Sequence, residues 1–95
     1  MECRSIQFTR HAFERMFERA LSPDVVRRII REGEQIASYA DDKPLPSVLI
    51  LGFDAGGPVH VLVAKNLQSN ECIVVTVYRP DPALWRDGFK TRRHQ

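Results

Sequence analysis

The sequence predicts an α+β fold in which two N-terminal helices pack on one face of a three- to four-stranded antiparallel sheet. In the first third of the chain, apolar residues recur with helical spacing. Beyond Gly33 the period falls to two and β-branched residues dominate. The loops between the expected strands are too short for a parallel crossover, which indicates antiparallel neighbours.

The chain has 95 residues, which is enough for one domain. We expect that domain to span residues 1–86 and a basic, disordered tail to occupy residues 87–95. Hydrophobic residues at 43% and charged residues at 27% are typical of a globular protein and exclude collagen-like and low-complexity chains. No apolar run is long enough for a membrane helix, so we expect no membrane partner.

Both expected helices carry an apolar stripe and a polar face. The first runs from about Thr9, an N-cap, to about Ala20, and its stripe contains Phe13, Met16 and Phe17. The second begins at Ser22-Pro23-Asp24 and is expected to end at Gly33 in a left-handed C-cap. Its stripe contains Val25, Val26, Ile29 and Ile30.

The strands are expected at residues 47–53, 59–64 and 72–78, with a weaker candidate at 35–39. Period-two alternation in the last two strands suggests that His60, Thr76 and Tyr78 share the more polar face of the sheet. The predicted core combines both helices with three strands: Phe13, Met16, Phe17, Val26, Ile29, Ile30, Leu49, Leu51, Val61, Val63, Ile73, Val75 and Val77.

The two cysteines, Cys3 and Cys72, form no CxxC pair, and no charged start followed by an apolar run precedes the domain. We therefore expect a cytoplasmic protein in which both cysteines are free thiols.

Two histidines are candidates for chemistry. His11 and Arg15 lie four residues apart on the first helix, so a proton-transfer group would sit beside a phosphate-binding cation. The alternative is that His11 caps or packs at the helix start while Arg15 pairs with a nearby acid. His60 interrupts an apolar strand, and either an open face or a buried hydrogen bond to a backbone carbonyl would explain it.

Several familiar chemistries are not indicated. The glycines match neither a P-loop nor a dinucleotide fingerprint, no zinc spacing occurs, and no serine lies in a GxSxG elbow. We therefore expect no cofactor and no metal.

Four strings together carry a family resemblance: TRHAFERM at 9–16, GEQI at 33–36, PVHV at 58–61 and TVYRPD at 76–81. With them the chain resembles the bacterial family catalogued as "domain of unknown function 4258". That family is in turn similar to the small endoribonuclease toxins of the RelE and BrnT type, whose fold is helices followed by an antiparallel sheet.

The resemblance implies a metal-independent endoribonuclease in which a 2′-hydroxyl attacks the adjacent phosphate. His11 and His60 would be the acid and base, and the substrate would be bound by Arg15, Thr76, Tyr78 and Arg79. The alternative is a non-catalytic interaction module of the same fold, with an antitoxin-like protein or a second copy as its partner instead of RNA. Convergence of His11, Arg15 and His60 on an open cleft would favour the nuclease, whereas a buried His60 bonded to the backbone would favour the module.

Overall fold

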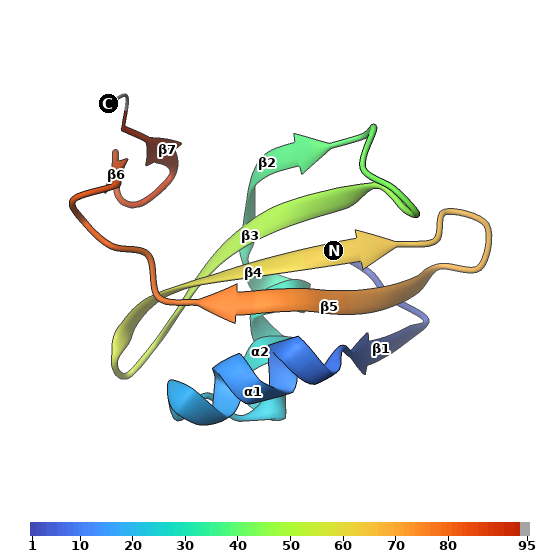
Figure 1. The fold of residues 1–95 in the computed structure, drawn as a ribbon, viewed down its shortest axis with the longest axis horizontal. Helices are drawn as coiled ribbons and strands as arrows, with labels where there is room; N and C mark the ends of the chain where they lie inside the picture. The colour runs from blue at the N-terminus through green and yellow to red at the C-terminus, as the bar shows by residue number, and fades with distance from the viewer. Residues whose placement is uncertain (94–95) are drawn as a thin grey trace.

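The computed structural model describes residues 1–93, and these form two helices and two sheets (Figure 1). In chain order the elements are β1 (Ser5–Phe8), α1 (Arg10–Glu18), α2 (Pro23–Glu32), β2 (Glu34–Tyr39), β3 (Ser47–Asp54), β4 (Gly57–Lys65), β5 (Glu71–Tyr78), β6 (Trp85–Arg86) and β7 (Thr91–Arg92). No helix in the described part of the chain is long and apolar enough to cross a membrane.

The main sheet has five strands in the order β1-β5-β4-β3-β2, and β1 runs parallel to β5. The prediction of two N-terminal helices packed on an antiparallel sheet of three or four strands is therefore wrong. The meander from β2 to β5 is antiparallel, as the short loops require. The strand that was missed, β1, is only four residues long and precedes the helices, and the rest of the chain up to β5 forms the crossover that a parallel pair needs.

Both helices begin with the caps expected from the sequence. The hydroxyl of Thr9 accepts a hydrogen bond from the Ala12 amide at 3.0 Å, and that of Ser22 accepts one from the Val25 amide at 3.2 Å. The C-cap prediction for α2 is wrong, because Gly33 has φ −74° and ψ 173° and passes directly into β2. A Cβ there would lie 2.5 Å from the Ile29 carbonyl oxygen, so glycine is required by close approach and not by a left-handed backbone.

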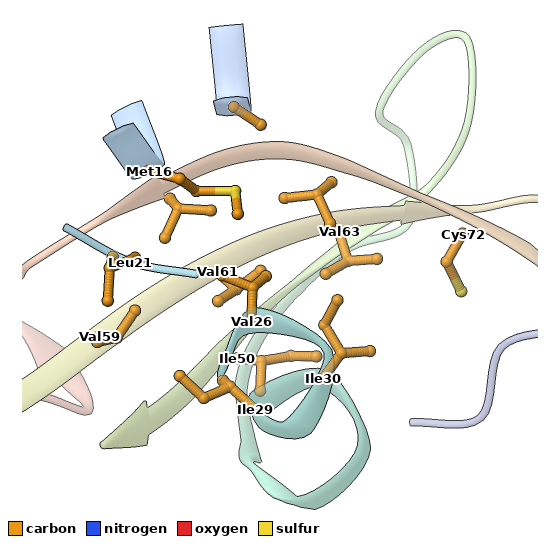
Figure 2. Packing of buried hydrophobic residues seen from close by; sticks show 13 residues of the cluster. Met16, Leu21, Val26, Ile29, Ile30, Ile50, Val59, Val61, Val63 and Cys72 are labelled. Atoms are coloured by element: carbon orange, nitrogen blue, oxygen red, sulfur yellow. The ribbon is translucent and has the colours of Figure 1, made fainter. Parts of the chain in front are cut away.

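The core lies between the helices and one face of the sheet (Figure 2), with α1 against β5 and α2 against β3 and β4. Met16 of α1, Ile29 and Ile30 of α2, and Val61 and Val63 of β4 are buried in it. Two aromatic residues predicted for the core lie at the surface instead: Phe13 is 49% exposed and Phe17 is 88% exposed. The reason is that α1 lies beside the edge of the sheet, where only its Ala12–Met16 side is covered.

A β-bulge changes which residues of β5 face the core. Val74 pairs with Val63 and Thr76 pairs with Leu62, so Val75 is an extra residue between them. Strict alternation would place Val75 and Val77 on one face and Val74 on the other. The structure instead buries Val74 and Val77 and leaves Val75 and Ile73 only half-buried, which corrects their predicted place in the core.

The opposite face of the sheet is covered in part by the C-terminal hairpin of β6 and β7, which lies across the sheet from the helices in Figure 1. Beneath it, Leu49, Leu51 and His60 are buried, although they lie outside the main core. The domain boundary expected after residue 86 falls within this hairpin. The structure folds residues 87–93 back on the domain, and residues 94–95 lie outside the described part.

The prediction of free thiols is wrong, because Cys3 and Cys72 form a disulfide. The parallel pairing of β1 with β5 brings the two cysteines together, with Ile6 opposite Cys72 in the register. A prediction that lacks β1 has no reason to place Cys3 beside β5.

Candidate functional site

The most distinctive polar group of the molecule is His60, whose side chain has no exposed surface. The β4–β5 register places it opposite Tyr78, and its Nδ1 lies 3.1 Å from the Tyr78 hydroxyl. Its Nε2 lies 2.8 Å from the backbone carbonyl of Phe89, in the C-terminal hairpin. The Trp85 ring meets the imidazole edge-on, with centroids 4.5 Å apart. His60 therefore joins the sheet to the hairpin.

These contacts fix the protonation of the imidazole. A backbone carbonyl only accepts hydrogen bonds, so Nε2 carries a proton and donates it to the Phe89 oxygen. In the neutral ring Nδ1 is then an acceptor, and the Tyr78 hydroxyl donates to it. Burial lowers the pKa of His60, while the Phe89 carbonyl raises it by a smaller amount. The neutral imidazole thus has both ring nitrogens satisfied.

The partners of His60 are held in the same environment. Burial is also the main cause of the raised pKa of the Tyr78 hydroxyl, which remains a hydrogen-bond donor at neutral pH. Phe89 has a φ of 72°, a left-handed backbone that non-glycine residues adopt at a cost. The hairpin holds Phe89 in this conformation while its carbonyl faces His60.

Arg79 lies just beyond β5, where it pairs with Asp54, the last residue of β3. Its Nη1 and Nη2 each donate to one Asp54 carboxylate oxygen at 2.9 Å. This bidentate ion pair is largely shielded from solvent, and the hydrogen bonds from Arg79 lower the pKa of Asp54. Gly56 makes room for the guanidinium, because a Cβ there would lie 2.8 Å from Nη2. The guanidinium of Arg79, expected to bind substrate, therefore already forms an ion pair within the protein.

His11 and Arg15 lie on α1, as expected, but form separate contacts. The exposed His11 places Nε2 3.0 Å from the Thr76 hydroxyl. Arg15 donates to the Glu18 carboxylate at 2.7 Å, so it forms an ion pair with a nearby acid. Thr76 thus contacts His11, whereas Tyr78 contacts His60.

The structure therefore brings the predicted site residues together in pairs and not as one cluster. In residues 1–93 no hydrogen bond joins His11 or Arg15 to His60. Beside Tyr78 and Trp85 the sheet is hollowed by about 400 Å³, and His60 is not part of the lining. Within the same range, no group of three or more His, Cys, Asp or Glu side chains is placed to hold a metal ion.

Sequence reasoning missed two partners in these contacts. Asp54 ends β3, just before a glycine-rich turn, and nothing in the surrounding sequence marks it as the partner of an arginine 25 residues away. The Phe89 carbonyl leaves no signal at all, because every residue has one. The single Trp85 after two prolines was the available indication that the C-terminal segment folds back on the sheet.

Comparison with known families matches residues 8–79 to the model of the family described as domain of unknown function (DUF4258). The match spans both helices and the meander up to Arg79, and leaves out the C-terminal hairpin and all of β1 except Phe8. No curated protein and no solved structure matches the chain.

Proposed function

We propose that this chain, which belongs to the family described as domain of unknown function (DUF4258), works as a non-catalytic interaction module that binds a protein partner through α1. The observation that carries the proposal is the burial of His60. The nuclease alternative needs His11 and His60 as an acid and base that both reach one phosphate.

A catalytic histidine must exchange protons with its substrate. His60 has no exposed surface, and both of its ring nitrogens are engaged by Tyr78 and Phe89. Its lowered pKa disfavours the protonated form that a general acid at neutral pH would need. Exposing the ring would require the C-terminal hairpin to leave the sheet. These features support a structural role for His60.

The outer face of α1 supports partner binding. Phe13 and Phe17 lie one helical turn apart on this face, and Phe17 is 88% exposed. A soluble chain gains about 1.5–3 kcal/mol by burying a phenylalanine side chain, so two neighbouring exposed rings favour a covered state.

A second copy of the chain is the partner that the charges of α1 fit best. The helix carries two internal ion pairs, Arg10 with Glu14 and Arg15 with Glu18. In a twofold-symmetric contact each patch meets its own copy, so a strongly charged patch would repel itself. The nearly neutral surface around the two phenylalanines avoids that repulsion.

The test is the mass of the chain in solution over a concentration series, by sedimentation equilibrium. We expect a reversible dimer in the wild type and a monomer in Phe17→Ser. The matched control is Leu67→Ser, which removes a 72% exposed apolar side chain from the β4–β5 loop and should leave the dimer intact. A wild type that remains monomeric at every concentration, or equal loss in both variants, would refute the proposed partner.

A ribonuclease assay tests the other function predicted from the sequence, RNA cleavage of the kind carried out by RelE and BrnT toxins. We expect purified wild-type chain to leave RNA intact, alone and in the presence of ribosomes. Cleavage that is lost in His11→Ala and His60→Ala, with the folds of both variants retained, would replace the proposal by the nuclease and make RNA the partner.

We also propose a cytoplasmic location, which stays a prediction. Disulfides are uncommon in that compartment, so the Cys3–Cys72 bond bears on it directly. Trapping thiols by alkylation in intact cells, followed by mass analysis, should find these cysteines reduced if the location is right. A fully oxidised pair would indicate an oxidising compartment.

A further inference from the structure

We infer that a groove beside the N-terminal segment of the chain, next to strand β1, binds a phosphate-bearing ligand. The groove has a volume of about 580 Å³ and lies between the segment before β1, the outer side of α2 and the end of β4. No residue of α1 lines it, and this inference does not depend on the proposed dimer.

The charge of the groove is the first observation. Four cationic side chains line it, Arg4, Arg27, Arg31 and Lys65, and Glu2 is the acidic residue among the lining. Arg27 pairs with Asp24 at 3.2 Å. Among residues 1–93, Arg4, Arg31 and Lys65 have no carboxylate within 4.0 Å. Cationic side chains that line one groove in excess over acidic ones repel one another, and a bound anion would relieve that repulsion.

The walls of the groove are held in place by the fold. The Arg4 amide donates to the Asn70 carbonyl at 2.8 Å, and the Cys3–Cys72 disulfide ties the same segment to β5. The Lys65 ammonium donates to the Glu2 carbonyl at 2.8 Å. These contacts position two of the cationic residues before any ligand arrives, which lowers the entropic cost of binding.

The Arg27 guanidinium is also oriented. Its central carbon lies 5.3 Å from the centroid of the Phe8 ring, in a cation–π contact. Stacking on the ring and the exposed pair with Asp24 restrict how this side chain moves. A positioned guanidinium recognises planar pairs of oxygens better than a free one does.

Phosphate fits this groove better than a single carboxylate does. Three arginines offer planar forks of N–H donors that match phosphate oxygens, and a lysine adds a point charge. A carboxylate brings one negative charge, whereas a phosphomonoester, a diphosphate or successive phosphodiesters bring two or more. Ile6 and Ile30 add apolar lining that can contact a non-polar part of the ligand, and the volume lies in the range of small-ligand sites.

The experiment uses the oxidised chain and three probes at low salt. Pyrophosphate is titrated by calorimetry, and a fluorescein-labelled ten-nucleotide RNA and a labelled ten-glutamate peptide are titrated by anisotropy. The test variant is the double substitution Arg4→Gln with Arg31→Gln. The matched control, Lys43→Gln with Arg86→Gln, removes the same charge from exposed positions outside the groove.

We expect pyrophosphate and RNA to bind the wild type and to compete with each other. The groove variant should bind both about tenfold or more weakly, and the control within about twofold of wild type. For RNA, loss of two contacts should reduce the slope of log K against log salt by about 1.4. Tighter RNA than pyrophosphate binding identifies a nucleic-acid backbone as the source of the phosphate, and the reverse identifies a small phosphate compound.

Three results would overturn the inference. The first is that neither phosphate probe binds the wild type at low salt. The second is that the glutamate peptide binds the wild type as tightly as the RNA does. Equal weakening in the groove and control variants would show that binding follows net charge and not this groove. Thermal melts of both double variants confirm that they are folded. Because Phe17→Ser leaves the groove intact, its dimer result and the phosphate result can fail separately.

Discussion

Replacing His60 by alanine tests the structural role of the buried imidazole. The substitution removes the hydrogen bonds to Tyr78 and Phe89 and the edge-on contact with Trp85. Each of these three interactions contributes about 1 kcal/mol, so the free energy of unfolding should fall by about 3 kcal/mol. For a domain of this size, that corresponds to a decrease in the melting temperature of about 15 °C.

Two readouts separate a local effect from a global one. Far-UV circular dichroism follows the whole domain, while the fluorescence of Trp85, the only tryptophan, follows the hairpin. We expect His60→Ala to shift the tryptophan emission to the red even before melting, because the indole loses its contact with the ring. His11→Ala is the control: this exposed histidine contributes one surface hydrogen bond, so its removal should cost less than about 1 kcal/mol.

The reasoning is refuted if His60→Ala melts within about 2 °C of the wild type and keeps the same tryptophan emission. That result would mean that the hairpin does not depend on His60. The burial of this histidine would then no longer argue against a catalytic role, and the nuclease alternative would regain its second group.

Two further predictions concern solution conditions. The free energy of unfolding should be at its full value above about pH 6.5 and should decline as the pH falls further, because the pKa of His60 is lowered in the folded state and the unfolded state binds the proton first. In denaturation experiments over a pH series, His60→Gln should reduce this decline. A variant whose stability depends on pH as the wild type's does would contradict the prediction. The cysteines of the Cys3–Cys72 disulfide are 69 residues apart, so its reduction should lower the free energy of unfolding, measured by urea titration, by about 4 kcal/mol. Unfolding curves that overlap with and without reductant would contradict the disulfide.

Local patterns in the sequence predicted the elements that depend on local physics. The hydroxyl of Thr9 before an amphipathic run specifies where α1 begins, and Ser22-Pro23 does so for α2. The antiparallel meander follows from short turns. The same reasoning could not find β1, because a four-residue strand carries too little periodicity and its partner is remote in sequence.

Prediction of the candidate site was limited in the same way, because the sequence shows local patterns but not contacts between distant segments. That His60 and Tyr78 share a face could be expected from alternation, and the register pairs them. The bulge at Val75 and the return of the hairpin over the sheet could not be expected, because both depend on packing between distant segments. Helical spacing identified Phe13 and Phe17 as one apolar stripe, but not whether any part of the protein covers it.

The parallel edge of the sheet also has a consequence for the order of folding. The strands from β2 to β5 each pair with the strand next to them in sequence, so they can assemble by successive hairpins as the chain emerges from the ribosome. The first strand must wait for the last long one, since its hydrogen-bonding partner is β5. Its docking completes the sheet and juxtaposes the cysteines, so oxidation of this pair would report that the chain has reached its native topology.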